Sequence, residues 1–173
     1  NLYSFNVKVD KHAADNTAKK LVGAEFYFKN SSGQYYKRDE TTKNVTWVLN
    51  KTEATMLSSD TNGVLTFTGI DVGTYYLEET KAPDGYNLLS GDVTVVINKN
   101  AANNGYVATV DLHSATVAAD DLTVTASIAN STGTMLPETG GTGTIIFIVV
   151  GAVAVIGAGL FLVTNKRMSK EGI

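Results

Sequence analysis

The chain has 173 residues with 14 basic and 17 acidic side chains, a formal net charge of −3, two histidines and no cysteine. The lack of cysteine excludes disulfides, thiolate metal sites and cysteine nucleophiles, and an acidic chain gives no electrostatic support for nucleic-acid binding. Two histidines are too few for a histidine-rich metal or catalytic cluster, and the sequence has no calcium-loop or phosphate-binding glycine pattern. We therefore expect no metal, no cofactor and no nucleic-acid partner.

Residues 1–130 are typical of short β-strands. Apolar and polar residues alternate over short runs, and turn-forming Gly, Asn and Asp separate these runs. Residues 13–21 fit either a loop or a short helical turn, and we leave that choice open. The spacing predicts an all-β domain over 1–130, a β-sandwich of immunoglobulin-like architecture. The expected strands cover residues 4–9, 24–29, 34–37, 45–49, 64–68, 74–79, 93–97, 106–111 and 122–128.

A long apolar segment lies near the C-terminus. No charged residue occurs between Gly140 and Asn165, and residues 144–164 are almost entirely apolar. A helix of this length spans roughly 30 Å, which matches the hydrocarbon core of a bilayer. The sequence therefore predicts a linker over 131–143 and one transmembrane helix over 144–164.

The tail after this segment, residues 165–173, is basic. Lys166, Arg167 and Lys170 follow the apolar run, and positive charge beside a membrane span marks the cytoplasmic side. The domain before the span then lies outside the cell. An outward-facing domain needs an export signal, and Asn1 begins a polar, strand-like segment, so we expect further sequence upstream.

The residues just before the apolar segment are Leu136, Pro137, Glu138, Thr139 and Gly140. The order of this motif, an apolar span and a basic tail resembles the LPxTG cell-wall sorting signal of Gram-positive surface proteins. The resemblance implies that a sortase cuts between Thr139 and Gly140 and forms a thioester, which an amine then attacks. Pro137 suits this role because it keeps the preceding residue extended.

A second motif lies within the predicted domain. Residues 75–86, YYLEETKAPDGY, match the pattern YxLxETxAPxGY at every fixed position. This pattern resembles the E-box of Gram-positive pilins and of the Cna B-type repeat domains of collagen adhesins. Lys8-Val9-Asp10 and residues 21–26, LVGAEF, resemble further motifs of these domains. The resemblance covers about residues 5–140 and implies an intramolecular Lys–Asn isopeptide bond between the first and last strands.

The E-box contains the expected catalytic group. Alternation along a strand places Glu79 on the same face as Tyr75 and Leu77. If that face is the core, Glu79 is a buried carboxyl. Burial raises the pKa of a carboxyl and lowers that of a lysine, so a buried pair can exchange a proton and leave a neutral, nucleophilic amine. Glu79 would then carry protons while the amine attacks an asparagine amide and ammonia leaves.

The amine is assigned to Lys8, from its Lys-x-Asp setting, and the amide to Asn130, which ends an apolar strand face. Strict alternation places Lys8 opposite the apolar residues of its strand, so this assignment needs a bulge or a strand buried on both faces. Lys11 is the alternative amine. Asn98 and Asn100 are the alternative amides. The simpler interpretation is an ordinary Lys8–Glu79 salt bridge.

Together these features are interpreted as the C-terminal domain and sorting region of a Gram-positive pilin, with a backbone subunit favoured and no enzyme activity expected. The expected partners are a sortase, a peptidoglycan precursor or neighbouring pilin subunits, a host ligand, and the membrane before sorting. The mature protein is expected at the cell wall and extracellular surface, after a transient membrane-anchored precursor. The alternative is a stalk domain of a wall-anchored adhesin, and a third hypothesis is an enzyme whose catalytic domain lies upstream.

Overall fold

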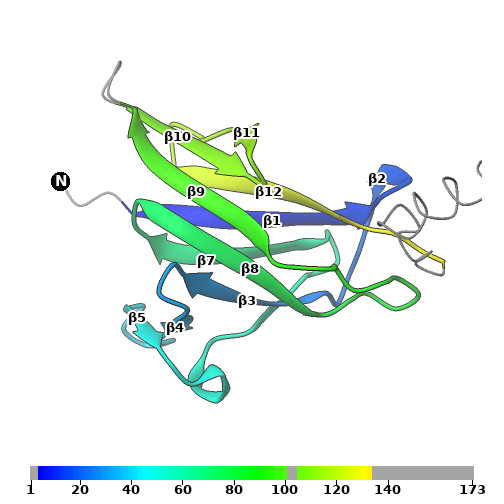
Figure 1. Cartoon of the computed structure of the whole chain (residues 1–173), viewed down its shortest axis with the longest axis horizontal. Helices are drawn as coiled ribbons and strands as arrows, with labels where there is room; N and C mark the ends of the chain where they lie inside the picture. The colour runs from blue at the N-terminus through cyan, green and yellow to red at the C-terminus, as the bar shows by residue number, and fades with distance from the viewer. Residues whose placement is uncertain (1–3, 101–104, 134–173) are drawn as a thin grey trace, which may run out of the picture. The chain divides into compact units, whose positions relative to one another are not determined.

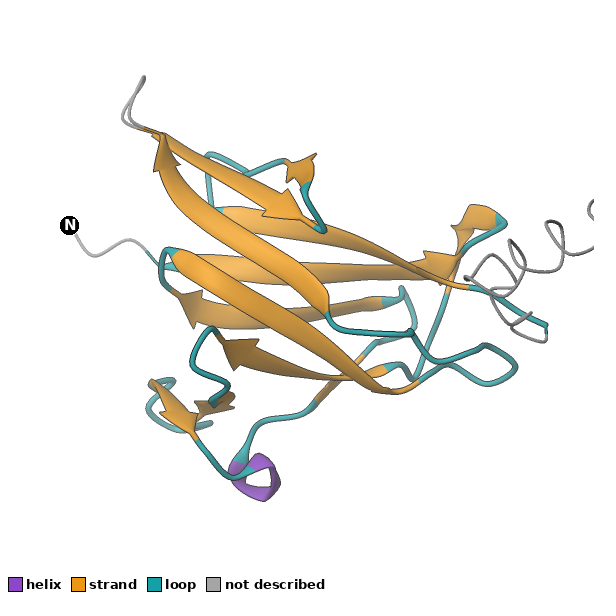
Figure 2. Ribbon diagram, in the orientation of Figure 1, coloured by secondary structure: helices purple, strands orange, loops and turns teal. Residues whose placement is uncertain are grey.

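Two β-sheets pack face to face around one hydrophobic core (Figures 1 and 2). The computed structural model describes residues 4–100 and 105–133. The smaller sheet contains β1 (Phe5–Ala13), β2 (Asn16–Lys20), β7 (Val64–Ile70) and β12 (Thr123–Asn130). The larger sheet contains β3 (Glu25–Asn30), β4 (Tyr35–Arg38), β5 (Val45–Val48), β6 (Leu57–Ser58), β8 (Gly73–Lys81), β9 (Val93–Asn100), β10 (Gly105–Val110) and β11 (His113–Ala115). A short 3₁₀ turn, Lys51–Glu53, follows β5.

The smaller sheet is built around β1. This strand pairs in parallel with β12 along Asn6 to Ala13, and it pairs antiparallel with β7 and β2. Lys11 lies opposite Ile128, and Ala13 lies opposite Asn130. The first and last strands of the domain are therefore direct neighbours, as Figure 1 shows.

The larger sheet has the order β11-β10-β9-β8-β3-β4-β5, and β6 also pairs with β3. The E-box strand β8 lies between β9 and β3 and is antiparallel to both. This central position makes the inward face of β8 part of the core.

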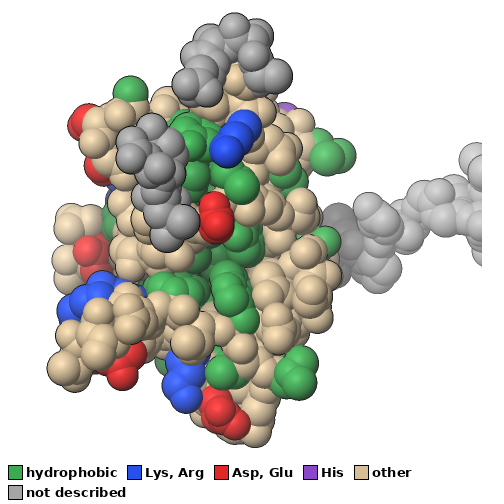
Figure 3. All heavy atoms as spheres, turned by 90° about the vertical axis from the view of Figure 1, so that its left-hand side faces the viewer, with side chains coloured by type: hydrophobic (Ala, Val, Ile, Leu, Met, Phe, Trp, Pro, Cys, Tyr) green, Lys and Arg blue, Asp and Glu red, His purple; other side chains and the backbone are tan. Residues whose placement is uncertain are grey.

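The core follows from alternation along the strands. Inward residues of β1, β3, β8, β9 and β12 are buried, and their neighbours in sequence are partly or fully exposed, except at the end of β1, where Lys11, His12 and Ala13 are all buried. Phe28 stacks with Phe67 and Tyr75 at ring-centroid distances of 5.0 and 5.1 Å. Viewed from one end, hydrophobic side chains are visible in the middle of the face, with charged side chains around them (Figure 3).

Every strand predicted from the sequence is present, and the all-β sandwich is confirmed. By sequence, residues 13–21 fit either a loop or a short helical turn. In the structure this segment contains the strand β2 instead. All five residues of β2 are exposed, so this strand has no apolar alternation that could have predicted it. The short strands β6 and β11 were also not predicted.

The predicted membrane span, 144–164, lies outside the described residues, as do the sorting motif 136–140 and the basic tail. Within 4–100 and 105–133, no helix has the length and apolar character needed to cross a membrane.

Candidate crosslinking site

An amine, a carboxyl and an amide meet in the core between the two sheets. The Nζ atom of Lys11 lies 3.5 Å from Oε1 of Glu79, and the side chains of both residues are fully buried. Asn130, which is 1% exposed, donates from Nδ2 to Oε2 of Glu79 at 2.9 Å. One carboxylate therefore bridges a lysine of β1 and an asparagine of β12 from its own position on β8.

The local structure around β1 explains why Lys11 lies there. Lys11 shares the inward face of β1 with Phe5, Val7 and Val9, as the spacing of two residues requires. Its backbone N–H donates to the carbonyl of Gly63 at 2.7 Å. A Cβ atom at position 63 would lie 2.4 Å from the Lys11 carbonyl oxygen, and φ at Gly63 is +71°, so a glycine is required for this close approach.

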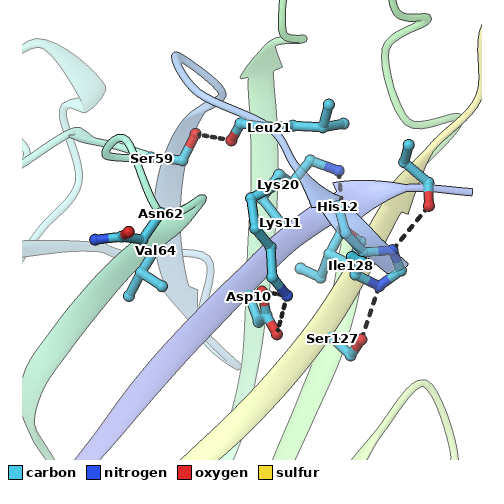
Figure 4. Close-up of polar contacts among 12 residues, drawn as sticks. Asp10, Lys11, His12, Lys20, Leu21, Ser59, Asn62, Val64, Ser127 and Ile128 are labelled. Atoms are coloured by element: carbon cyan, nitrogen blue, oxygen red, sulfur yellow. Dashed lines mark hydrogen bonds and ion pairs between the residues drawn. The ribbon is translucent and has the colours of Figure 1, made fainter. Parts of the chain in front are cut away.

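The neighbours of Lys11 secure the same end of β1 to β2 and to β12 (Figure 4). Asp10 pairs with Lys20 of β2, with an Nζ–Oδ1 distance of 2.6 Å. Nδ1 of His12 donates to the Ala13 carbonyl at 3.0 Å, and in the neutral imidazole Nε2 then accepts from the Ser127 hydroxyl of β12 at 2.8 Å. These contacts hold the backbone of Lys11 between β2 and β12.

The protonation of Lys11 is altered by its surroundings. Burial lowers the pKa of Lys11 below its ordinary value of 10.5, and this effect outweighs the nearby Glu79 carboxylate, which acts in the opposite direction. The Nζ atom also donates to the carbonyl of Ile128 at 3.3 Å. A lower pKa enlarges the fraction of neutral amine near pH 7, which is the nucleophilic form.

Of the three residues assigned from the sequence, the structure brings Glu79 and Asn130 together and places Lys8 elsewhere. Lys8 is half-buried on the outward face of β1, where it lines a shallow surface pocket with Thr66 and Asp121. The pairing of β1 with β12 runs without a break past Lys8, so the bulge that would turn it inward is absent there. Lys11, the alternative amine, lies beside Glu79 instead. Lys11 lies an even number of residues from the apolar residues of β1, and this spacing identifies it in the sequence as the inward-facing lysine.

The alternative amides lie on another strand. Asn98 and Asn100 are residues of β9, opposite Val107 and Gly105 of β10. Asn98 is exposed. Among these three asparagines, a contact with Glu79 is seen for Asn130.

The lowered pKa of Lys11 predicts a pH dependence in a variant that cannot crosslink. Asn130→Ala removes the amide and leaves Lys11 as a free amine. Between the lowered pKa and 10.5, the unfolded chain binds a proton at Lys11 that the folded chain does not bind. Stability should therefore rise with pH, by at most about 1.4 kcal/mol per pH unit.

Urea unfolding of Asn130→Ala at a series of pH values up to 10.5, the ordinary pKa of lysine, measures this slope. The control is Lys11→Met/Asn130→Ala, which lacks the titrating amine. Equal slopes in the two proteins would contradict the lowered pKa.

Comparisons with known proteins define the family. Residues 5–111 match the SpaA family, described as a prealbumin-like fold domain, and residues 129–170 match the LPXTG cell wall anchor motif. The chain belongs to the prealbumin-like SpaA domain family. The anchor match includes Leu136–Gly140, and together with the SpaA domain it places the protein at the cell wall, on the extracellular side.

Solved structures similar to this SpaA domain are pilins. The backbone protein of pilus 2b from group B streptococcus is 34% identical, with a TM-score of 0.60 over 78% of this chain and 43% of that chain. The C-terminal domain of the shaft pilin SpaA from Lactobacillus rhamnosus GG is 21% identical, with a TM-score of 0.51 over 76% of this chain and 99% of that chain.

The full-length major pilin RrgB from Streptococcus pneumoniae is 20% identical, with a TM-score of 0.52 over 76% of this chain and 31% of that chain. This chain therefore spans less than half the length of the group B streptococcus and pneumococcal pilins. At 20–21% identity, the second and third similarities show the fold alone. No curated protein matches the chain.

Proposed function

We propose that the chain is the C-terminal, sortase-anchored part of a Gram-positive pilus subunit, and that a Lys11–Asn130 isopeptide bond stabilises it. The role is structural: the domain carries load and has no substrate to turn over. The observation that carries the proposal is the buried Lys11–Glu79–Asn130 cluster, which joins the first and last strands of a domain that precedes a cell wall anchor motif.

The geometry supports a direct reaction between the two side chains. The neutral Nζ of Lys11 attacks Cγ of Asn130, and a new C–N bond forms as the carbonyl opens to a tetrahedral intermediate. Oε1 of Glu79, 3.5 Å from Nζ, accepts a proton from the attacking nitrogen. Glu79 returns a proton to Nδ2, which lies 2.9 Å from its Oε2, and the Cγ–Nδ2 bond breaks to release ammonia. The products are one secondary amide and one ammonia.

The position of the bond suits a subunit under tension. Tension applied through the two ends of the domain acts directly on its first and last strands, and β1 and β12 are paired along their length. A covalent link between them prevents their separation. In a chain without cysteine, an amide crosslink takes the place that a disulfide would have.

The assignment to a pilus is tested by whether the subunits are joined into covalent polymers in the native host. Covalently joined subunits remain together in boiling detergent, so extracts of the native host should show a ladder of high-mass species that react with an antibody to this domain. The same strain without sortase is the control and should lose the ladder. A single wall-linked species in the native host would contradict a backbone subunit and favour the stalk of a wall-anchored adhesin.

A further inference from the structure

The loop that follows β8 contacts both the carboxyl and the amide of the proposed reaction. The backbone N–H of Leu89 donates to Oε2 of Glu79 at 2.9 Å. The backbone carbonyl of Asn87 accepts a hydrogen bond from Nδ2 of Asn130. This loop, residues 82–92 and named the E-box loop here because it begins within that motif, therefore supplies a donor for the carboxylate and an acceptor for the amide.

The Asn87 carbonyl and Oε2 of Glu79 together fix which way the Asn130 amide faces. A backbone carbonyl accepts hydrogen bonds and cannot donate them, so it selects the –NH₂ group of the amide over its oxygen. With Nδ2 bound to Asn87 and to Glu79, the oxygen Oδ1 is turned away and has no hydrogen-bond partner among the described residues. The reverse orientation would put two acceptor oxygens against each other at Asn87.

This orientation suits the proposed chemistry. Nδ2 is the atom that must leave as ammonia, and it needs a proton before the bond to Cγ breaks. Because Nδ2 faces Oε2 of Glu79, the leaving group lies next to the group that supplies that proton. A flipped amide would place the oxygen there instead.

Asn87 is itself held by the chain just after Asn130. Its backbone N–H donates to the carbonyl of Ser131 at 2.9 Å, and its side-chain Nδ2 donates to the carbonyl of Gly133. Asn87 thus has three hydrogen bonds to residues 130–133. The side-chain bond to Gly133 is the one that a substitution can remove without deleting a backbone group.

We propose that Asn87 is a positioning residue for the crosslink: its side chain binds Gly133 and thereby holds its carbonyl where it orients the leaving amide of Asn130. The proposal rests on the Lys11–Asn130 bond proposed above. It assigns Asn87 a role in the rate of bond formation, separate from the stability of the finished fold.

The rate of ammonia loss tests this role. The full chain is synthesised in a cell-free system with detergent micelles, samples are denatured at timed intervals, and intact mass gives the fraction that has lost one ammonia. Asn87→Ala should crosslink at least tenfold more slowly than the wild type. Asn87→Gln retains an amide donor and should crosslink faster than Asn87→Ala. Asp84→Ala, at an exposed position of the same loop, should react at the wild-type rate.

A second control separates positioning from stability. Val95→Ala creates a cavity in the core on β9, so it destabilises the fold and leaves the loop unchanged. Folded Val95→Ala should lose ammonia at the wild-type rate. If Asn87→Ala does not fold, Asn87→Asp provides the comparison, because the aspartate side chain has the same shape as asparagine but no N–H donor.

The outcomes distinguish this proposal from the proposed function. A wild-type chain that keeps its full sequence mass would overturn the crosslink itself. A wild-type chain that loses ammonia, together with an Asn87→Ala chain that loses it equally fast, would overturn the role of Asn87 and leave the crosslink intact.

Discussion

Lys11→Met should leave the protein at its full sequence mass and lower its melting temperature by about 10–20 °C. A crosslink between residues 11 and 130 closes nearly the whole domain, and the chain-entropy estimate for such a loop is about 4–5 kcal/mol. For a domain of this size, each kcal/mol corresponds to a few degrees in melting temperature. Intact mass and calorimetry measure the two effects.

Lys8→Met is the matched control, because Lys8 lies on the outward face of the same strand. It should still lose one ammonia and melt within a few degrees of the wild type. In the crosslinked wild type the Lys11 nitrogen is an uncharged amide, so Lys11→Met takes no cation away from Glu79. The double variant Lys11→Met/Glu79→Gln, which has no buried carboxyl, tests whether the lowered melting temperature comes from the missing bond alone. A crosslinked Lys11→Met protein, or a Lys8→Met protein without the bond, would reverse the assignment.

Thr139→Ala should shift the protein from the wall fraction to the membrane fraction of a sortase-bearing host, with the wall-linked amount reduced at least tenfold. Thr139 supplies the carbonyl that the sortase is expected to attack within the anchor motif. Pro137→Ala should also shift the protein toward the membrane fraction, because proline keeps the motif extended so that it fits an enzyme groove. Cell fractionation followed by mass spectrometry measures the distribution.

Thr132→Ala is the control for sorting, since this exposed threonine precedes the motif by several residues. It should reach the wall as the wild type does. A wild-type protein that still carries residues 145–163 and is extracted by detergent alone would contradict sortase processing. An unchanged wall fraction in Thr139→Ala would contradict the cleavage position.

Side-chain alternation accounts for most of what the sequence predicts about the site. β8 and β12 alternate strictly, so Glu79 shares a face with Leu77, and Asn130 shares one with Ile128. The same rule applied to β1 identifies Lys11. The Lys-x-Asp resemblance favoured Lys8, and that choice needed a bulge that the pairing of β1 with β12 does not contain.

Other parts of the site carry no such signal. β2 is exposed on every residue, so no hydrophobic pattern predicts that it secures the end of β1. The contacts of the E-box loop with Glu79 and Asn130 use the backbone of Leu89 and Asn87, and any residue has these groups. Which backbone group meets which side chain depends on the path of the loop, and that path follows from the packed fold.

The most direct test of the crosslink is peptide mass spectrometry of the digested wild-type protein. A Lys11–Asn130 bond should give a branched species in which the peptide containing Lys11 is joined to the peptide containing Asn130, with a mass equal to their sum less one ammonia. Fragmentation should place the branch at those two residues. Linear peptides with free Lys11 and Asn130, or a branch at Lys8, would contradict it.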